Sequence, residues 1–389
     1  MNRRPRVLVL SAAIEPPWTR GDRNLVRGIV EHLERYRATV MTHAVDEALG
    51  AEQAHPLVEL GHEAVPAWGN KREVPPSAWE RMRRFRRLVR ATDADVVHLF
   101  WPAELVLALG LAPIVRERGL PLVHTLLRAP RTTVGIRRAV VGDEVACLTE
   151  ETLQRVQREG VEHATWVPPG IRAQSQRSAA DRSAIRQRYG LPAGEPLVLY
   201  AGDYRHTFAA RTVAATLPRV VREVDCHFVM ACRVRDDEDA AEEQRIKQAV
   251  AADGLADRIT WLNEVDDLRA LFAVADLQVF PADSHHEKMD MPLVLLEGMA
   301  EGCATVVARK PPLTELVAAR AARGVPALEP VALAAAIIDL IRDDKQRDAL
   351  RVRGQKLVTT RFDIAQVAGR YEALYDAARA RHAPREGAA

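Results

Sequence analysis

The sequence predicts an α/β protein built from two doubly wound domains, each with a mainly parallel sheet, that face each other across a cleft. Three observations support this prediction. The chain has 389 residues, which is too many for one ordinary hydrophobic core. Short apolar runs alternate with longer segments of helical periodicity, as is typical of βαβ units. A break with two prolines and a glycine near residue 170 separates two such series.

The first series predicts an N-terminal, Rossmann-like domain over residues 1–172. Its expected strands are short and rich in valine and leucine, which is typical of strands buried in a parallel sheet. They lie at residues 7–11, 39–42, 96–99, 120–125 and 145–149. Residues 50–75, which contain several prolines and glycines, predict no regular element.

The second series predicts a C-terminal, Rossmann-like domain over residues 191–363. A polar linker at residues 173–190 joins the two domains, and residues 364–389 are expected to form a last helix and a tail. The expected strands of the second domain lie at residues 197–201, 226–231, 259–262, 277–280 and 305–308. Open α/β sheets bind ligands at the carboxyl ends of their strands, so the cleft is the expected site.

Composition excludes several classes of protein. The net charge of +2 is not that of a nucleic-acid polycation. No apolar run approaches the ~20 residues that a membrane span needs. The four cysteines lack metal-ligand spacing, which indicates a reducing compartment and predicts a cytoplasmic protein. The apolar run near the N-terminus is interpreted as a first strand rather than a signal peptide. The absence of G-x-G-x-x-G and Walker motifs argues against a dinucleotide oxidoreductase or an ATPase.

The most informative segment follows the expected strand at residues 277–280. A polar loop containing Lys288 and Asp290 leads into an expected helix at residues 292–301, with Pro292 in its first turn. The unpaired N–H groups and the dipole of a helix N-terminus favour an anion, and a nucleoside diphosphate is the candidate. We expect Asp290 to cap this helix or to accept hydrogen bonds from sugar hydroxyls.

Glu297 lies inside this otherwise apolar helix, among Leu295, Leu296 and Met299. A buried carboxylate is costly unless something hydrogen-bonds it, and the hydroxyls of a ribose could do so. The alternative is that Glu297 faces solvent on an amphipathic helix.

Six segments resemble, in the same order, motifs of the retaining glycosyltransferases of family four. The run Leu-Leu-Glu-Gly-Met-Ala at residues 295–300, followed by Thr-Val-Val-Ala, resembles the family's "LLEAMA" and "PVVA". Residues 95–98 resemble its "DVVH" strand and residues 200–202 its "YVG". The other three segments are residues 167–171, 257–262 and 361–375.

This resemblance implies the GT-B fold and transfer of a sugar such as a hexose from a nucleotide-diphosphate sugar to a glycan or lipid-linked saccharide. It also implies retention of anomeric configuration, a role in polysaccharide biosynthesis, no metal or other cofactor, and a last helix that crosses back to the N-terminal domain. The implied donor-binding residues are Gly202, Arg205, Arg211, Lys288, Asp290, Met291, Pro292, Leu293 and Glu297, with Glu297 at the ribose. Gly21 is expected in an acceptor or phosphate loop.

Two histidines are candidates for a catalytic role. His98 and His124 each end an expected strand of the N-terminal domain, and the family places a histidine in this region near the transferred sugar. The alternative is that both are structural histidines with satisfied ring nitrogens. The pair at residues 285–286 is not expected to bind a metal, because adjacent histidines on a loop chelate poorly.

The chain departs from the family pattern at two places. The first glutamate of the motif falls on Met289, and Gly202 is followed by Asp203 instead of an arginine. Two alternatives therefore stay open. One is a catalytically degenerate GT-B protein that binds a nucleotide, a saccharide or a partner without turnover. The other is a nucleotide-sugar epimerase.

Arginines surround an apolar stripe of Met82, Phe85 and Val89 between residues 81 and 90. This pattern predicts an amphipathic helix that packs on the sheet and leaves a basic face in solvent. The alternative is peripheral contact with the inner face of a membrane, which would suit a lipid-linked acceptor. Nucleic acid is not an expected partner, because no aromatic side chains are interleaved as a stacking platform.

Overall fold

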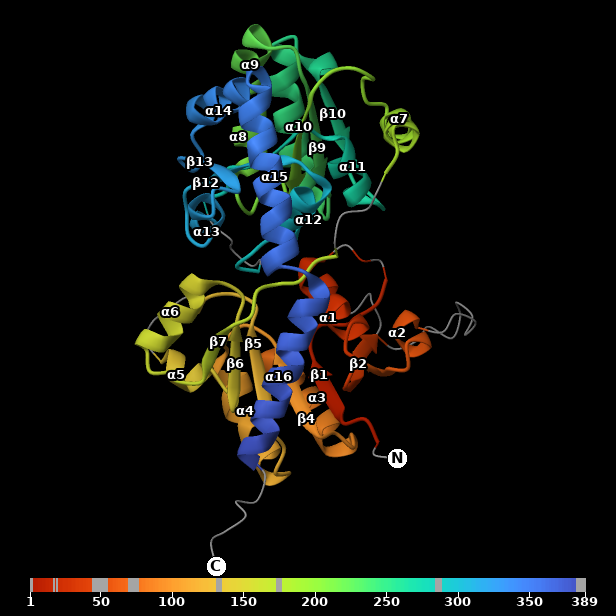
Figure 1. The fold of residues 1–389 in the computed structure, drawn as a ribbon, viewed down its shortest axis with the longest axis vertical. Helices are drawn as coiled ribbons and strands as arrows, with labels where there is room; N and C mark the ends of the chain where they lie inside the picture. The colour runs from red at the N-terminus through yellow and green to blue at the C-terminus, as the bar shows by residue number, and fades with distance from the viewer. Residues whose placement is uncertain are drawn as a thin grey trace, which may run out of the picture. The chain divides into compact units, whose positions relative to one another are not determined.

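The computed structural model describes residues 3–16, 18, 20–43, 55–68, 77–130, 135–172, 177–283 and 289–382. The chain divides into two compact units, each with one parallel sheet (Figure 1). Unit 1 consists of Met1–Gly170, Lys288–Asp290 and Asp363–Ala389, and unit 2 of Ile171–Glu287 and Met291–Phe362. Both units are Rossmann-like, so the predicted α/β class is confirmed.

Unit 1 contains a seven-stranded sheet in the order β3-β2-β1-β4-β5-β6-β7. Its strands are β1 (Arg6–Leu10), β2 (Arg37–His43), β3 (Glu63–Trp68), β4 (Val96–Phe100), β5 (Leu122–Leu126), β6 (Glu144–Cys147) and β7 (Ala164–Trp166). Its helices are α1 (Gly21–Glu31), α2 (Pro56–Glu59), α3 (Ala78–Ala91), α4 (Leu105–Glu117), α5 (Ile136–Ala139), α6 (Glu150–Arg158) and α16 (Ile364–His382). The strand order reverses between β1 and β4, which marks a switch point where such sheets bind ligands.

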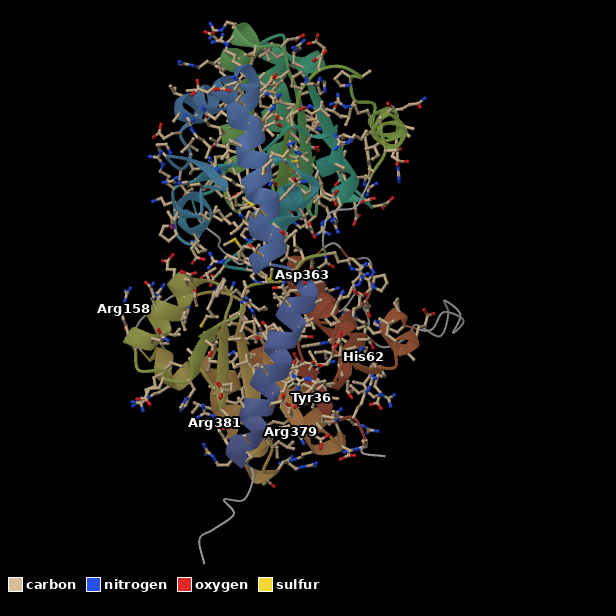
Figure 2. All side chains as sticks on the ribbon, viewed as in Figure 1. Tyr36, His62, Arg158, Asp363, Arg379 and Arg381 are labelled. Carbon is tan, nitrogen blue, oxygen red and sulfur yellow. The ribbon has the colours of Figure 1, made fainter. Side chains whose placement is uncertain are left out.

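The last helix, α16, belongs to unit 1 and runs along β4, β5 and β6 (Figure 1). Glu372 accepts hydrogen bonds from the backbone N–H groups of Glu34 at 2.9 Å and Arg35 at 2.6 Å. The hydroxyl of Tyr36 donates to Asp376 at 2.7 Å, and the guanidinium of Arg379 lies beside it (Figure 2). These contacts fix α16 to the segment between α1 and β2.

Unit 2 contains a six-stranded sheet in the order β10-β9-β8-β11-β12-β13. Its strands are β8 (Leu197–Gly202), β9 (His227–Cys232), β10 (Ile259–Leu262), β11 (Leu277–Phe280), β12 (Ala304–Ala308) and β13 (Ala322–Val325). Its helices are α7 (Ala179–Arg188), α8 (Ala209–Ala214), α9 (Leu217–Glu223), α10 (Asp237–Ala252), η2 (Ala256–Arg258), α11 (Leu268–Val274), α12 (Leu293–Glu301), α13 (Thr314–Ala318), α14 (Pro330–Arg342) and α15 (Asp344–Arg361). The strand order reverses between β8 and β11.

One polar side chain fixes α12 to this sheet. Gln278 of β11 is buried, and its amide donates to the carbonyl of Leu295 at 2.9 Å and to Oγ1 of Thr305 at 2.8 Å. Gly298 leaves room for this amide, because a Cβ at residue 298 would lie 2.2 Å from Oε1 of Gln278. A side chain at position 298 would therefore crowd the Gln278 amide at this close contact between helix and strand.

Three strands and four α-helices of the described residues were not predicted from the sequence; two of these helices are α13 and α15. α2 and β3 lie within residues 50–75, where no element was expected, and β7 and β13 are only three and four residues long. Helix α7 lies in the segment that was expected to be a linker. No helix in the described parts of the chain is long and apolar enough to cross a bilayer.

Candidate functional site

The carboxyl edge of the unit 2 sheet is the candidate site. The neighbouring strands β8 and β11 end there, at the switch point, and lead into the segments at residues 203–208 and 281–292. Helix α12 follows the second segment, with Pro292 as its N-cap and no side chain capping its first amides. An uncapped helix N-terminus can bind an anion through backbone N–H groups and the helix dipole.

Glu297 lies one turn inside α12 and is partly buried. Its carboxylate makes no hydrogen bond or ion pair with any residue in the described ranges. Burial raises the pKa of Glu297 above its ordinary value, Arg269 opposes this shift, and the charges of Glu301 and Asp267 add to it. A partly buried carboxylate without a partner is costly unless a ligand hydrogen-bonds it. The proposed ribose contact of Glu297 stays a prediction that this geometry favours.

Asp290 does not cap α12, contrary to our expectation. Its backbone N–H and its carboxylate bond within unit 1: the N–H donates to the carbonyl of Leu127 at 3.0 Å, and the carboxylate accepts from the N–H of Ala129 at 2.8 Å and from Oγ1 of Thr152 at 2.5 Å. Its side chain is buried, and burial raises its pKa to about 6. These bonds leave the carboxylate no reach to the α12 amides, which begin three residues later.

Met291, Pro292 and Leu293 are all buried. Their side chains therefore anchor the start of α12 in the protein, and only backbone groups there remain for an anion. Lys288 and the histidine pair at residues 285–286 lie outside the described residues.

Arg205 and Arg211, which we expected at the donor phosphates, already have acidic partners on or beside α10. The guanidinium of Arg205 contacts Asp239 at 2.9 Å and Asp236 at 2.7 Å, and also pairs with Glu238. Arg211 donates from Nε and Nη2 to Glu242 at 3.0 and 2.5 Å. Acidic residues 31–34 positions away balance both charges, so the phosphate role of these arginines stays a prediction that this geometry does not favour.

Gly202 ends β8, and its lack of a side chain makes room for Tyr200. A Cβ at residue 202 would lie 2.3 Å from the hydroxyl of Tyr200, which donates to the carbonyl of Asp203 at 3.2 Å. The same segment contains a residue that the sequence did not indicate. Phe208 is 54% exposed and has a φ of 49°, a left-handed conformation that is costly for an aromatic residue and is concentrated at functional sites.

His98 and His124 lie in the core of unit 1. Nδ1 of His98 is 2.8 Å from the hydroxyl of Tyr375 and Nε2 is 2.7 Å from Oγ1 of Thr125. The ring of His124 bonds to the carbonyl of Trp101 at 3.0 Å and to the N–H of Val141 at 3.3 Å. Burial lowers the pKa of His98 well below its ordinary value and that of His124 to about 4. Because no ring nitrogen is available to a substrate, this geometry fits structural histidines rather than catalytic ones.

At the switch point of unit 1, Gly21 is the first residue of α1, whose amides no side chain caps. This switch point also contains a Glu–His pair that the sequence did not indicate. Glu15 lies between β1 and α1, and His43 is the last residue of β2. The carboxylate of Glu15 bonds to Nδ1 of His43 at 2.8 Å and accepts from its backbone N–H at 3.0 Å. This arrangement holds the imidazole in one orientation, and Nε2 of His43 has no hydrogen bond with a described residue.

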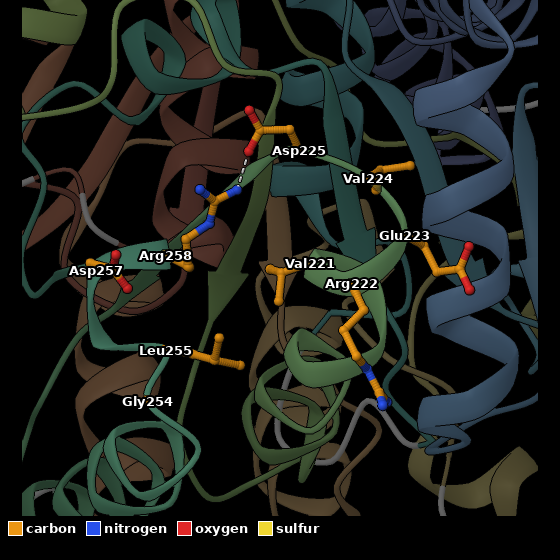
Figure 3. Close-up of a pocket in the computed structure, with 9 residues that line it drawn as sticks. All are labelled: Val221, Arg222, Glu223, Val224, Asp225, Gly254, Leu255, Asp257 and Arg258. Carbon is orange, nitrogen blue, oxygen red and sulfur yellow. Dashed lines mark hydrogen bonds and ion pairs between the residues drawn. The ribbon is translucent and has the colours of Figure 1, made fainter.

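The described residues include no group of three or more His, Cys, Asp or Glu that could hold a metal ion. All four cysteines are buried thiols. Unit 2 also has a hollow of about 480 Å³, lined by Val221, Arg222, Glu223, Val224, Asp225, Gly254, Leu255, Asp257 and Arg258 (Figure 3). Asp225 and Arg258 form an ion pair just before β9 and β10 begin. The hollow therefore lies at the amino ends of the strands, away from the edge where such sheets bind ligands.

The candidate site in unit 2 lies within the part of the chain that matches a known family. Residues 195–343 match the family model described as "Glycosyl transferases group 1". This range runs from just before β8 through α14 and contains Gly202, Arg205, Arg211 and Glu297. No curated protein matches the chain.

Solved structures are similar over nearly the whole chain. HepE (Alr3699) of Anabaena, in complex with UDP and glucose, is 18% identical, with a TM-score of 0.74, 96% of this chain covered and 100% of that one. Sucrose-phosphate synthase of Thermosynechococcus elongatus is 19% identical, with a TM-score of 0.76 and 97% and 100% covered. The N-terminal domain of Candida albicans trehalose-6-phosphate phosphatase is 11% identical, with a TM-score of 0.74 and 97% of both chains covered. These similarities confirm the GT-B fold, but at such identities they do not establish the activity.

Two glutamates on α12 allow a paired test of Glu297. Glu297→Gln should lower donor affinity or kcat/KM tenfold or more, because a charge-assisted hydrogen bond is typically worth about 1.5–3 kcal/mol, and should not lower the unfolding temperature, because the charge that it removes has no partner in the described residues. Glu301 is buried and bonds to Arg269 at 2.7 Å, so Glu301→Gln should lower the free energy of unfolding by about 1–3 kcal/mol. A Glu297→Gln variant that unfolds earlier but binds nucleotide normally would make Glu297 a structural carboxylate.

The raised pKa of Asp290 predicts a specific pH dependence of stability. Between about pH 4 and 6 the folded protein retains a proton on Asp290 that the unfolded chain has lost, so stability falls as pH rises through this window. Asp290→Asn cannot ionise. It should match the parent protein near pH 4 and exceed it by roughly 2–3 kcal/mol near pH 7, as measured by denaturant unfolding. A variant that is less stable than the parent at both pH values would contradict this prediction.

Proposed function

We propose that this protein is a glycosyltransferase that takes a sugar from a nucleotide-diphosphate donor bound by unit 2. One observation carries the proposal. Glu297, a partly buried carboxylate without a partner in the described residues, lies one turn after an uncapped helix N-terminus, at the switch point of a sheet. A nucleoside diphosphate offers what both features lack: hydroxyls for the carboxylate and an anion for the amides.

The chemistry of sugar transfer fits this arrangement. Departure of the diphosphate leaves a sugar with cationic character, so the reaction needs fixed positive potential at the leaving group. The N-terminus of α12 supplies it through backbone amides. The segment lies within residues that match the glycosyltransferase family model, and one structure of similar fold is described as a complex with UDP-glucose. The resemblance to family four supports a hexose donor and retention of configuration as finer parts of the proposal.

The proposed acceptor, a glycan or lipid-linked saccharide, binds at the carboxyl edge of unit 1. Glu15 and His43 supply an oriented imidazole there, and Gly21 starts a helix with uncapped amides. The proposal has three further parts: a role in polysaccharide biosynthesis, catalysis without a metal or cofactor, and a cytoplasmic location. The location includes peripheral contact at the inner face of a membrane. The four cysteines are buried and none forms a disulfide in the described residues, which fits a reducing compartment.

A second candidate is a GT-B protein that binds a nucleotide without turnover. Two observations favour it. The first glutamate of the family motif is replaced by Met289, which is buried. The arginines expected at the phosphates are paired with the carboxylates of Asp239 and Glu242. Such a protein would keep Glu297 and the α12 amides for binding and lack the charges that stabilise the departing diphosphate.

Nucleotide binding should depend on the second phosphate. The protein should be stabilised more by nucleoside diphosphates than by the matching monophosphates in thermal unfolding, because ligands of the folded state raise its stability by mass action. Lys288→Ala should lose part of this preference. Lys345→Ala, at an exposed residue on α15, is the matched control and should keep it. Equal stabilisation by both classes of nucleotide would remove the main physical support for the transferase proposal.

Turnover then separates the candidates. The protein should release free nucleoside diphosphate from one of a panel of sugar nucleotides, at a rate that rises when glycan or lipid-linked acceptors are added, as measured by a coupled diphosphate assay. Binding without release would favour the non-catalytic protein. Conversion of one sugar nucleotide into its epimer, with no dependence on an acceptor, would indicate an epimerase.

A further inference from the structure

Helices α3 and α4 form one layer on a face of the unit 1 sheet. Met82 of α3 packs against α4 at Gly110, where a Cβ would lie 2.2 Å from Cγ of Met82. Arg81 bonds to Glu104 at 2.9 Å near the start of both helices, and Arg118 donates to the carbonyl of Arg90 at 2.8 Å near their ends. The helices therefore run side by side in the same direction, and their outward residues share one surface.

The apolar stripe predicted on α3 is not part of that surface. Met82, Phe85 and Val89 are buried in the core together with Leu107, Leu111, Ile114 and Val115 of α4. This result confirms the interpretation of α3 as a helix packed on the sheet. Lipid contact through that stripe is excluded, because these side chains already fill the core.

Other apolar side chains of the two helices point outward. Trp79 of α3 is 63% exposed, and Leu105 and Leu109 of α4 are 48% and 67% exposed. Pro113, one further turn along α4, is exposed as well. The spacing of four residues from Leu105 to Leu109 to Pro113 places these three on one outward face.

Arginines adjoin these apolar residues. Arg83, Arg87 and Arg90 continue the outward face of α3 from Trp79, are exposed, and form no ion pair with any residue that the structure describes. Of the acidic residues near these arginines, Glu80 bonds to Ser77 in a capping box, Asp93 pairs with Arg3 at 2.5 Å, and Glu117 of α4 is exposed. We call Trp79, Arg83, Arg87, Arg90, Leu105, Leu109 and Pro113 the α3–α4 surface.

We propose that the α3–α4 surface binds an anionic phospholipid bilayer. An exposed tryptophan and two exposed leucines beside unpaired arginines combine the two contributions to interfacial binding, apolar burial and attraction to anionic headgroups. Tryptophan favours the boundary between headgroups and acyl chains, and arginine can keep its charge at the headgroups while its stem lies on apolar surface. This inference rests on the peripheral membrane contact of the proposed function, for which it names the surface and the lipid charge, and does not depend on the proposed nucleotide chemistry.

Vesicle sedimentation with the full-length protein tests the proposal. The protein should bind phosphatidylcholine vesicles that contain phosphatidylglycerol, should bind pure phosphatidylcholine vesicles far less, and should dissociate as salt is raised. Arg83→Gln combined with Arg87→Gln should weaken partitioning about twenty-fivefold, since each arginine near such a surface contributes roughly fivefold. Leu109→Asp should weaken it at least about tenfold.

Matched controls lie in unit 2. Val331→Asp replaces a valine on α14 that is 61% exposed, and Lys345→Gln with Arg353→Gln removes two exposed positive charges from α15. Both should leave partitioning unchanged. Unchanged unfolding temperatures of all variants would show that folding is not affected.

Three results would overturn the proposal. The first is no binding to the anionic vesicles. The second is binding that the α3–α4 variants and the unit 2 variants reduce equally. The third is self-association of the protein that Leu109→Asp abolishes in the absence of vesicle binding, measured by analytical ultracentrifugation, because the surface would then be an interface between copies of this chain.

Discussion

The strands of both sheets are buried, so polar groups inside them have no water to bind and must find partners within the protein. His98 of β4 and Gln278 of β11 meet this requirement with hydrogen bonds of 2.7–2.9 Å. Asp290, buried in the segment before α12, meets it with bonds of 2.5 and 2.8 Å. Glu297 has no such partner among the residues that the structure describes, although it lies in an apolar helix of the same kind of core. The contrast distinguishes a carboxylate that a ligand can use from polar groups that only complete the fold.

A donor site at α12 is compatible with the departures of this chain from the family pattern. The anion binding that we propose at α12 uses backbone amides, which replacement of the flanking side chains leaves in place. Asp290 would repel a phosphate as an exposed carboxylate, but it is buried against Ala129 and Thr152 instead. Met289 and Met291, on either side of Asp290, are also buried, so apolar side chains flank Asp290 where the chain leads into α12.

The sequence predicted the architecture well, because alternating strands and helices leave a local pattern of apolar residues. It failed where that pattern was short or mixed. β3 has polar and apolar residues at irregular positions and lies at the edge of the sheet, and β13 includes an arginine and a glycine among four residues. A final helix after residue 364 was expected, but the contacts that hold it could not be read from the sequence.

The candidate site was predictable only in part. Glu297 could be identified locally, as a charge inside an apolar helix. The partners of Arg205 and Arg211 on α10 and the hydroxyl of Tyr375 beside His98 are distant in sequence, by 277 residues in the last case, so no local pattern reveals that these groups are already satisfied. Nothing in the sequence marks Phe208 as exposed, because an aromatic residue beside two alanines is usually buried. Only its backbone conformation and exposure single it out.

The close approach of Gly298 to Gln278 couples two positions that are 20 residues apart in the chain. The family motif has an alanine where this chain has Gly298, and its extra methyl group would occupy the space of the Gln278 amide. A change at either residue therefore affects the packing of the other. A return to alanine requires a smaller residue at position 278, and loss of the glutamine leaves a void beside the glycine. The relatives of this protein should fall into two groups according to this pair of residues, and the pair offers a marker of the lineage that does not depend on any catalytic residue.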